Sequence, residues 1–177
     1  MIYFITSNKH KYEEIKKILG NIKMLTISYP EIQVDKLEEV VLYGLEYLKE
    51  KVDRKFFIED SGLFIKCLNN FPGVYSSYIF KTIGNKGILK LMENKKDREA
   101  HFASVVGYYD GEINLFKGVC KGKIAKEERG KKGFGYDPIF IPKGKRKTFG
   151  EMEIDEKNLY SHRIKALKKF IDFLKYS

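Results

Sequence analysis

The chain has 177 residues, of which 43% are hydrophobic and 33% charged, a composition typical of a globular protein that buries a substantial core. No apolar run approaches the roughly 20 residues of a membrane span, and the first residues lack the cationic start of a signal peptide, so we expect no membrane contact and a cytoplasmic location. The two cysteines, Cys67 and Cys120, have neither zinc-site nor disulfide-scaffold spacing. We expect one domain over residues 1–177.

The formal net charge of +10 suits a polyanionic partner. A basic nucleic-acid-binding module is therefore one hypothesis, and a small phosphorylated ligand is another. The lysines are scattered through nearly every segment, without a low-complexity basic tail, so the charge alone does not separate the two.

The N-terminal part predicts a strand, a short polar loop and a helix. Residues 2–6 are typical of a buried strand, and apolar positions at helical spacing follow over residues 12–19, closed by Gly20. Ser7 or Asn8 can cap that helix. Its free N-terminal amides and Lys11 would suit an anion, but without a glycine-rich loop the residues alone favour a plain cap with solvated lysines.

Two groups of acids come next. A strand is predicted over residues 23–28 and a helix over residues 37–51, with Glu38 and Glu39 in its first turn, where the helix dipole favours acids. The strand formers of residues 56–58 then lead into Glu59, Asp60, Ser61 and Gly62. We expect the strand to end there in a turn and to resume at residues 63–66, which leaves two carboxylates at a strand end. They are either solvated loop acids or groups that hold a metal or activate water.

The middle of the chain predicts helices and a hairpin. Residues 71–76 are turn-like, and residues 77–95 have a helical pattern interrupted near Gly84 and Asn85. Alternating stretches over residues 100–109 and 112–124 are joined by Asp110 and Gly111, a strong hairpin signal that makes the predicted sheet mixed.

The C-terminal third contains an aromatic loop and a last helix. Gly133 and Gly135 bracket Phe134, whose ring either stands free to stack on a flat ligand or folds into the core. A short strand is predicted at residues 139–141. In the last helix Ser161 is the predicted N-cap, and His162 and Arg163 occupy the first turn, where cations are unfavourable unless an anion or acceptor is near. The pair is either a satisfied surface pair or a contact to a ligand, and the placement favours the ligand contact.

Several separated motifs match one pattern in order and spacing. They are Thr6-Ser7-Asn8 with Lys11, Leu37-Glu38-Glu39, Glu59-Asp60-Ser61-Gly62, Phe71-Pro72-Gly73, Phe134-Gly135-Tyr136-Asp137, Thr148-Phe149-Gly150-Glu151-Met152, Glu156-Lys157-Asn158 and Ser161-His162-Arg163. Over essentially its whole length the chain resembles the inosine triphosphate pyrophosphatase family. The resemblance implies an α/β fold with a long mixed sheet flanked by helices, two lobes with a cleft between them, and a homodimer. It also implies Mg²⁺-dependent hydrolysis of ITP, dITP or XTP to the monophosphate and pyrophosphate.

The resemblance also implies a role for each matching residue. Thr6, Ser7, Asn8 and Lys11 match the phosphate-binding segment, Glu39 a metal ligand, and Asp60 the general base and second metal contact. Ser61 matches a substrate contact, Phe134, Gly135, Tyr136 and Asp137 the purine-binding loop, and Lys157, His162 and Arg163 further base contacts. Ser7 departs from the family pattern, which usually has glycine there. Glu59 has no assigned role and is either a supporting group or a plain surface acid.

These residue types suit that chemistry. Mg²⁺ keeps several waters and needs only one or two protein carboxylates when phosphates supply further oxygens. Donors on Lys157, His162 and Arg163 would pair with the 6-oxo group of hypoxanthine or xanthine and be left unpaired by adenine. A pyrophosphatase for modified pyrimidine nucleotides remains a neighbouring hypothesis, and no specific nucleic-acid partner is expected.

Overall fold

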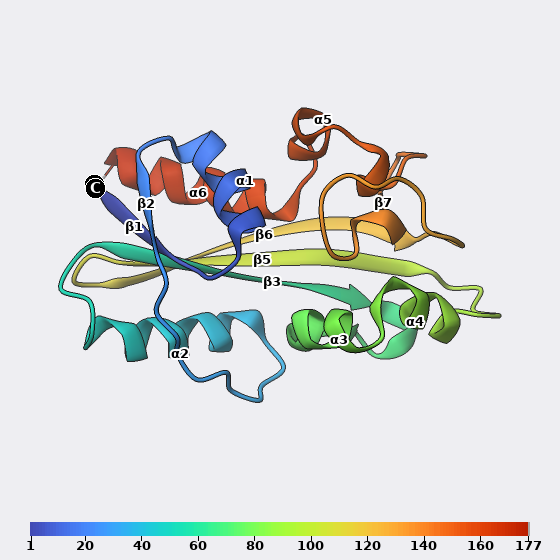
Figure 1. Cartoon of the computed structure of the whole chain (residues 1–177), viewed down its shortest axis with the longest axis horizontal. Coiled ribbons are helices and arrows are strands. Elements are labelled where there is room, and N and C mark those ends of the chain that lie inside the picture. Colours follow the sequence, from blue (N-terminus) through green and yellow to red (C-terminus); the bar gives the residue numbers. More distant parts are fainter. Residues whose placement is uncertain (177) are drawn as a thin grey trace. The chain divides into compact units, whose positions relative to one another are not determined.

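The computed structural model describes residues 1–176 (Figure 1). The elements follow in the order β1 (Ile2–Ile5), α1 (Lys9–Leu19), β2 (Ile22–Leu25), α2 (Leu37–Lys49), β3 (Phe56–Ile65), η1 (Lys66–Leu68), β4 (Phe71–Pro72), η2 (Gly73–Tyr75), α3 (Ser76–Thr82), α4 (Gly84–Leu91), β5 (Glu99–Tyr109), β6 (Ile113–Ile124), η3 (Asp137–Ile139), β7 (Phe140–Pro142), η4 (Phe149–Glu151), α5 (Ile154–Asn158) and α6 (His162–Tyr176). Among these residues no helix is both long and apolar enough to cross a membrane.

The strands form a mixed sheet in the order β2-β1-β3-β5-β6-β7, with β4 paired to β3. Strand β1 runs parallel to β2, with Phe4 opposite Met24, and parallel to β3. Strands β6 and β7 are antiparallel, as are β3 and β4. The prediction of an α/β fold with a mixed sheet and a β5–β6 hairpin is therefore confirmed.

The chain divides into two compact units. The first unit comprises Met1–Asp60, Ser104–Gly118 and the described residues from Arg163 onward, and the second comprises Ser61–Ala103 and Val119–His162. Strands β3, β5 and β6 contribute residues to both units. The prediction of one domain over the whole chain stays a prediction.

The first unit has its helices on both faces of its strands. In Figure 1, α1 and α6 lie on one face and α2 on the other. The core under α1 and α6 is built from apolar side chains of those helices and of β1, β3 and β5, among them Phe4, Ile15, Phe57 and Phe170. On the opposite face α2 packs so closely that a Cβ on Gly107 would lie 2.4 Å from Val41.

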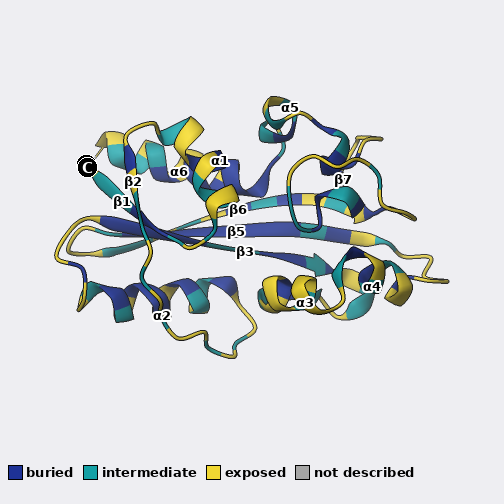
Figure 2. Ribbon diagram, viewed as in Figure 1, coloured by how far each residue is buried: buried dark blue, intermediate teal, exposed yellow. Residues whose placement is uncertain are grey.

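The second unit has a separate apolar core. It combines side chains of β3, α4, β5, β6, η3, β7 and η4, including Ile65, Ile88, Phe102, Phe140 and Phe149. Figure 2 shows that β5 is dark blue over most of its length, and Phe102 to Tyr108 are all buried.

The predicted break at Glu59–Gly62 is wrong. Strand β3 runs without interruption from Phe56 to Ile65, so both acids lie inside a strand and not at its end. Gly62 is needed for close backbone approach and not for a turn, because a Cβ there would lie 2.3 Å from the carbonyl oxygen of Gly73. The hydroxyl of Ser76 accepts a hydrogen bond from the Leu63 N–H and donates one to the Gly73 carbonyl, which fixes this approach.

Other boundaries differ by a few residues. Strand β2 is shorter than the predicted 23–28, α2 ends at Lys49, and the last short strand covers Phe140–Pro142. The predicted interruption near Gly84 is confirmed, since α3 ends at Thr82 and α4 begins at Gly84, which has φ +60°. The stop at Gly20 is confirmed as well, with φ +68° at the end of α1.

Candidate active site

Glu59 is the centre of a buried charge cluster in the first unit. One of its carboxylate oxygens lies 2.9 Å from the ammonium of Lys11 in α1, and the other lies 3.2 Å from Nε of Arg163 in α6. The hydroxyl of Ser104 on β5 donates to the same carboxylate at 2.5 Å. Arg163 also contacts Glu14 of α1 at 2.6 Å. The cluster therefore joins two helices and two strands through one carboxylate.

This arrangement keeps Glu59 ionised. Burial by itself would raise the pKa of Glu59, but the charges of Arg163 and Lys11 and the hydrogen bond from Ser104 lower it to about 2. The hypothesis that Glu59 is a plain surface acid is wrong, because only 6% of the residue is exposed. A permanently charged, fully enclosed carboxylate serves to hold Lys11 and Arg163 in place.

Asp60 is the more accessible acid of the pair. Its side chain is 29% exposed, and one of its oxygens lies 3.7 Å from the Lys11 ammonium. Because the Lys11 ammonium contacts both Glu59 and Asp60, it lies between the two carboxylates of β3. It also donates a hydrogen bond to the backbone carbonyl of Glu59 at 3.3 Å. Burial, followed by the charges of Asp60 and Glu59, raises the pKa of the Tyr29 phenol, which stays protonated and able to donate near these acids.

The predicted phosphate-binding segment forms the start of α1. Asn8 is the N-cap, and its side chain accepts from the Lys11 N–H at 3.1 Å. The hydroxyl of Thr6 accepts from the Asn8 N–H, also at 3.1 Å. Ser7 lies between them and is exposed. The prediction of a capped helix start is confirmed, and it brings the first-turn amides and Lys11 into the same unit as Asp60.

The acids at the start of α2 have different surroundings. Glu38 pairs with Lys117 of β6 at 2.6 Å, which outweighs partial burial and lowers the Glu38 pKa. Glu39 is exposed and lies in no ion pair among residues 1–176. In the same described part of the chain, no three His, Cys, Asp or Glu side chains gather as a metal cluster. Accessible oxygens such as those of Asp60 and Glu39 fit a Mg²⁺ ion that takes its other ligands from water and phosphate.

The aromatic loop of the second unit is organised by Asp137. A single carboxylate oxygen of this residue accepts from the Phe134 N–H at 3.0 Å and from the Lys157 ammonium at 2.8 Å. The Asp137–Lys157 pair is almost fully buried. The Lys157 ammonium lies 5.2 Å from the centre of the Phe134 ring, which is itself only partly buried. Phe134, Asp137 and Lys157, three of the residues predicted to bind the base, are therefore in mutual contact.

The remaining predicted contacts have structural neighbours of their own. Tyr136 folds into the core, and its hydroxyl donates to the Ser76 carbonyl at 2.8 Å. The ring of His162 is buried and stacks on Phe102 with centroids 4.6 Å apart. Ser61 is partly buried on β3. Of the aromatic pair in this loop, Phe134 is thus the more accessible ring, since it is partly buried and Tyr136 is buried.

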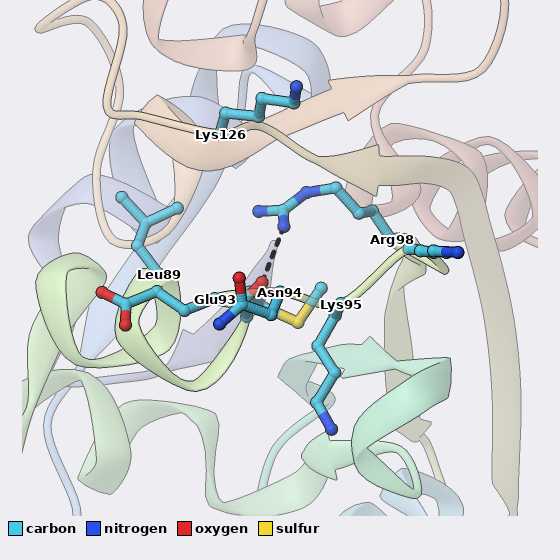
Figure 3. Close-up of a pocket in the computed structure, with 8 residues that line it drawn as sticks. Leu89, Glu93, Asn94, Lys95, Arg98 and Lys126 are labelled. Atoms are coloured by element: carbon cyan, nitrogen blue, oxygen red, sulfur yellow. Dashed lines mark hydrogen bonds between the residues drawn. The ribbon is translucent and has the colours of Figure 1, made fainter.

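A hollow of about 570 Å³ lies elsewhere in the second unit (Figure 3). The described residues that line it are Leu89, Met92, Glu93, Asn94, Lys95, Lys96, Arg98 and Lys126. None of these is a predicted site residue. The guanidinium of Arg98 donates to the carbonyls of Met92, Ile124 and Ala125, so it joins the end of α4 to the end of β6. In this hollow Arg98 therefore has a structural role.

Four buried residues that organise these groups were missed by sequence reasoning: Glu14, Ser76, Asn85 and Ser104. For Glu14 a signal exists, because it falls on the apolar stripe of α1 beside Ile15, where a charge needs a partner. The other three are small polar residues: Ser104 lies in an apolar strand, Ser76 starts α3, and Asn85 lies between Gly84 and Lys86. Ser104 contacts Glu59, 45 residues away, and Asn85 contacts Gly135, 50 residues away, so no local pattern marks these two contacts.

Fold and site together define an α/β protein with charged groups suited to a phosphorylated ligand. The model of the Ham1 family matches residues 2–173, and the chain therefore belongs to the Ham1 family. The dITP/XTP pyrophosphatase of Pyrococcus horikoshii is 58% identical over 98% of this chain and 96% of its own length. That of Thermococcus kodakarensis is 54% identical over 97% and 96%. The family membership predicted from the motifs is confirmed.

Solved structures agree with this assignment. The Ham1 protein of Staphylococcus aureus superposes with a TM-score of 0.87 at 28% identity, covering 99% of this chain and 98% of that one. A HAM1 protein from Coxiella burnetii gives 0.86 at 31% identity with the same coverage.

Proposed function

We propose that the protein hydrolyses non-canonical purine nucleoside triphosphates, namely ITP, dITP and XTP, to the monophosphate and pyrophosphate, and so removes them from the nucleotide pool. The observation that carries the proposal is the accessible Asp60 carboxylate beside Lys11 and the buried, ionised Glu59. Full-length similarity to proteins named dITP/XTP pyrophosphatase supports it.

Asp60 is the proposed general base. A water oxygen attacks the α-phosphorus, the bond between that phosphorus and the bridging oxygen breaks, and pyrophosphate leaves. The water proton passes to Asp60, whose partly exposed side chain can reach solvent. Lys11, held by Glu59 and by the Asn8 cap, offers its charge to the phosphates, and the first-turn amides of α1 add donors.

Mg²⁺ is the proposed cofactor, with Glu39 and Asp60 as its protein ligands. When bound, it would neutralise phosphate charge and polarise the reacting phosphoryl group. The carboxylates present suit it, since Mg²⁺ prefers oxygen ligands and tolerates a sparse protein contribution.

The second unit is proposed to recognise the base. Phe134 offers an accessible ring for stacking, and Lys157 uses one of its three donors on Asp137. A 6-oxo purine would accept hydrogen bonds that the 6-amino group of adenine cannot accept. A site built on such bonds discriminates by up to ~10⁴-fold. Arg163 is engaged by Glu14 and Glu59, so its side chain has fewer donors left for a base than that of Lys157.

The test is a substrate panel with purified protein and Mg²⁺. We expect ITP, dITP and XTP to release pyrophosphate and ATP to be a poor substrate, with GTP included because guanine also carries a 6-oxo group. Orthophosphate as the product, or ATP turned over as fast as ITP, would overturn the proposal. Preference for dTTP or UTP would instead support a pyrimidine pyrophosphatase.

A homodimer and a cytoplasmic location belong to the same proposal, and sedimentation of the purified protein tests the dimer.

A further inference from the structure

Asn85 links α4 to the aromatic loop. It lies in the first turn of α4, its side chain is buried, and its Nδ2 donates to the carbonyl oxygen of Gly135 at 3.1 Å. Its Oδ1 is also buried and finds no hydrogen-bond donor among the described residues. Asn85 and Gly135 are 50 residues apart in sequence and belong to the same unit.

The energetics argue against a role in stability. A buried amide oxygen without a donor costs about as much free energy as a neutral hydrogen bond returns, so the side chain of Asn85 adds little net stability. An apolar side chain of similar volume would fill the same space without that cost. The distinctive contribution of asparagine here is therefore the direction it imposes on the Gly135 carbonyl.

That carbonyl belongs to the centre of the loop. Gly135 has φ +60°, and a Cβ there would meet nothing within 4 Å, so glycine serves the backbone conformation and not close packing. The hydrogen bond from Asn85 fixes the peptide plane between Gly135 and Tyr136. On the other side of Gly135, the Phe134 N–H is fixed by Asp137. The Phe134 ring is thus carried on a backbone anchored at both ends.

We propose that Asn85 is a positioning residue for base recognition, which acts by holding the Gly135 carbonyl so that Phe134 presents its ring to a 6-oxo purine. The inference rests on the proposed function, because it assigns the loop to the base. Asn85 acts through the loop, and no role in the reaction at the phosphates is assigned to it. Loss of the Asn85 side chain should therefore affect substrate affinity and base choice more than the chemical step.

The test compares Asn85→Leu with the exposed neighbour Lys86→Ala as a matched control. For Asn85→Leu we expect an unchanged or higher Tm, an unchanged kcat, and a KM for ITP and XTP raised by ~3- to 10-fold, the size of one lost hydrogen bond. The preference for ITP over ATP should fall by a similar factor. A lower kcat for every nucleotide at unchanged KM, with a lower Tm, would show a merely structural role and overturn the inference.

A second measurement separates this inference from the proposed function. In the free protein, Asn85→Leu should speed hydrogen exchange of the Tyr136 amide, and Lys86→Ala should not. Unchanged exchange would refute the positioning role whatever the substrate is. If exchange speeds up but the wild-type protein hydrolyses no 6-oxo purine nucleotide, the proposed function fails, the loop anchor stands, and base recognition by Asn85 falls with that function.

A double-mutant cycle gives an independent check. Gly135→Ala strains the same backbone directly, because alanine disfavours the left-handed φ. If both changes act through the loop, the KM of Asn85→Leu/Gly135→Ala should rise by less than the product of the single effects. A fully multiplicative result would show that the two residues act independently and would count against the inference.

Discussion

Replacing Glu59 by glutamine should destabilise the protein in a pH-dependent way. The carboxylate balances Lys11 and Arg163 in a buried site, so Glu59→Gln leaves both cations without their shared partner. Removing one member of a buried ion pair typically costs about 3–5 kcal/mol. We expect a loss of that size in the free energy of unfolding at pH 7.

The pH dependence follows from the depressed pKa of Glu59. A folded-state pKa of about 2 against an ordinary value of 4.5 corresponds to roughly 3 kcal/mol of stabilisation. This stabilisation is complete above the unfolded pKa and is lost as the pH falls toward the folded pKa. Between pH 6 and pH 3 the stability gap between wild type and Glu59→Gln should therefore narrow by about 2 kcal/mol.

Urea denaturation at a series of pH values measures this gap. Glu13→Gln is the matched control, because Glu13 is an exposed acid on α1, and its gap to wild type should stay within about 0.5 kcal/mol at every pH. A gap for Glu59→Gln that is constant from pH 6 to pH 3 would refute the inference that a buried, ionised Glu59 holds the cluster together.

Three further predictions address the rest of the fold and site. Gly62→Ala should destabilise the protein by about 1–3 kcal/mol in urea, because its Cβ would collide with the Gly73 carbonyl, and a change below about 0.5 kcal/mol would contradict that packing. Asp60→Asn should keep the wild-type circular dichroism spectrum and lower kcat for dITP by ~10²- to 10⁴-fold, whereas retained turnover would exclude it as the base. Chelation by EDTA should stop pyrophosphate release and added Mg²⁺ should restore it; activity that persists in EDTA would remove the metal from the proposal.

Much of the fold could be predicted from the sequence because it depends on signals from residues that are adjacent in the chain. The Asp110–Gly111 hairpin, the Asn8 cap and the Gly20 stop each follow from the conformational preferences of a few adjacent residues. Strand β3 is different. Ser61 and Gly62 have turn chemistry, but the strand continues because the Gly73 backbone packs against Gly62, a contact that no local pattern reveals.

The candidate site, like the fold, could be predicted from the sequence only in part. The roles given to Lys11, Asp60 and Phe134 came from the motif order of a known family, and their types alone did not exclude solvated loops. The buried partner of Arg163 was unpredictable from its helix, because Glu59 is 104 residues away. The cation at the start of α6 favoured a ligand contact. In the structure Arg163 pairs with the protein's own Glu14 and Glu59, and the ligand contact stays a prediction.

The most direct test of the proposed reaction is the position of bond cleavage during hydrolysis of dITP in ¹⁸O-labelled water with Mg²⁺. If Asp60 activates water for attack on the α-phosphorus, the label should appear in deoxyinosine monophosphate and the pyrophosphate should be unlabelled. Mass spectrometry of the two products distinguishes the outcomes. Label in the pyrophosphate, or release of labelled orthophosphate, would contradict the account.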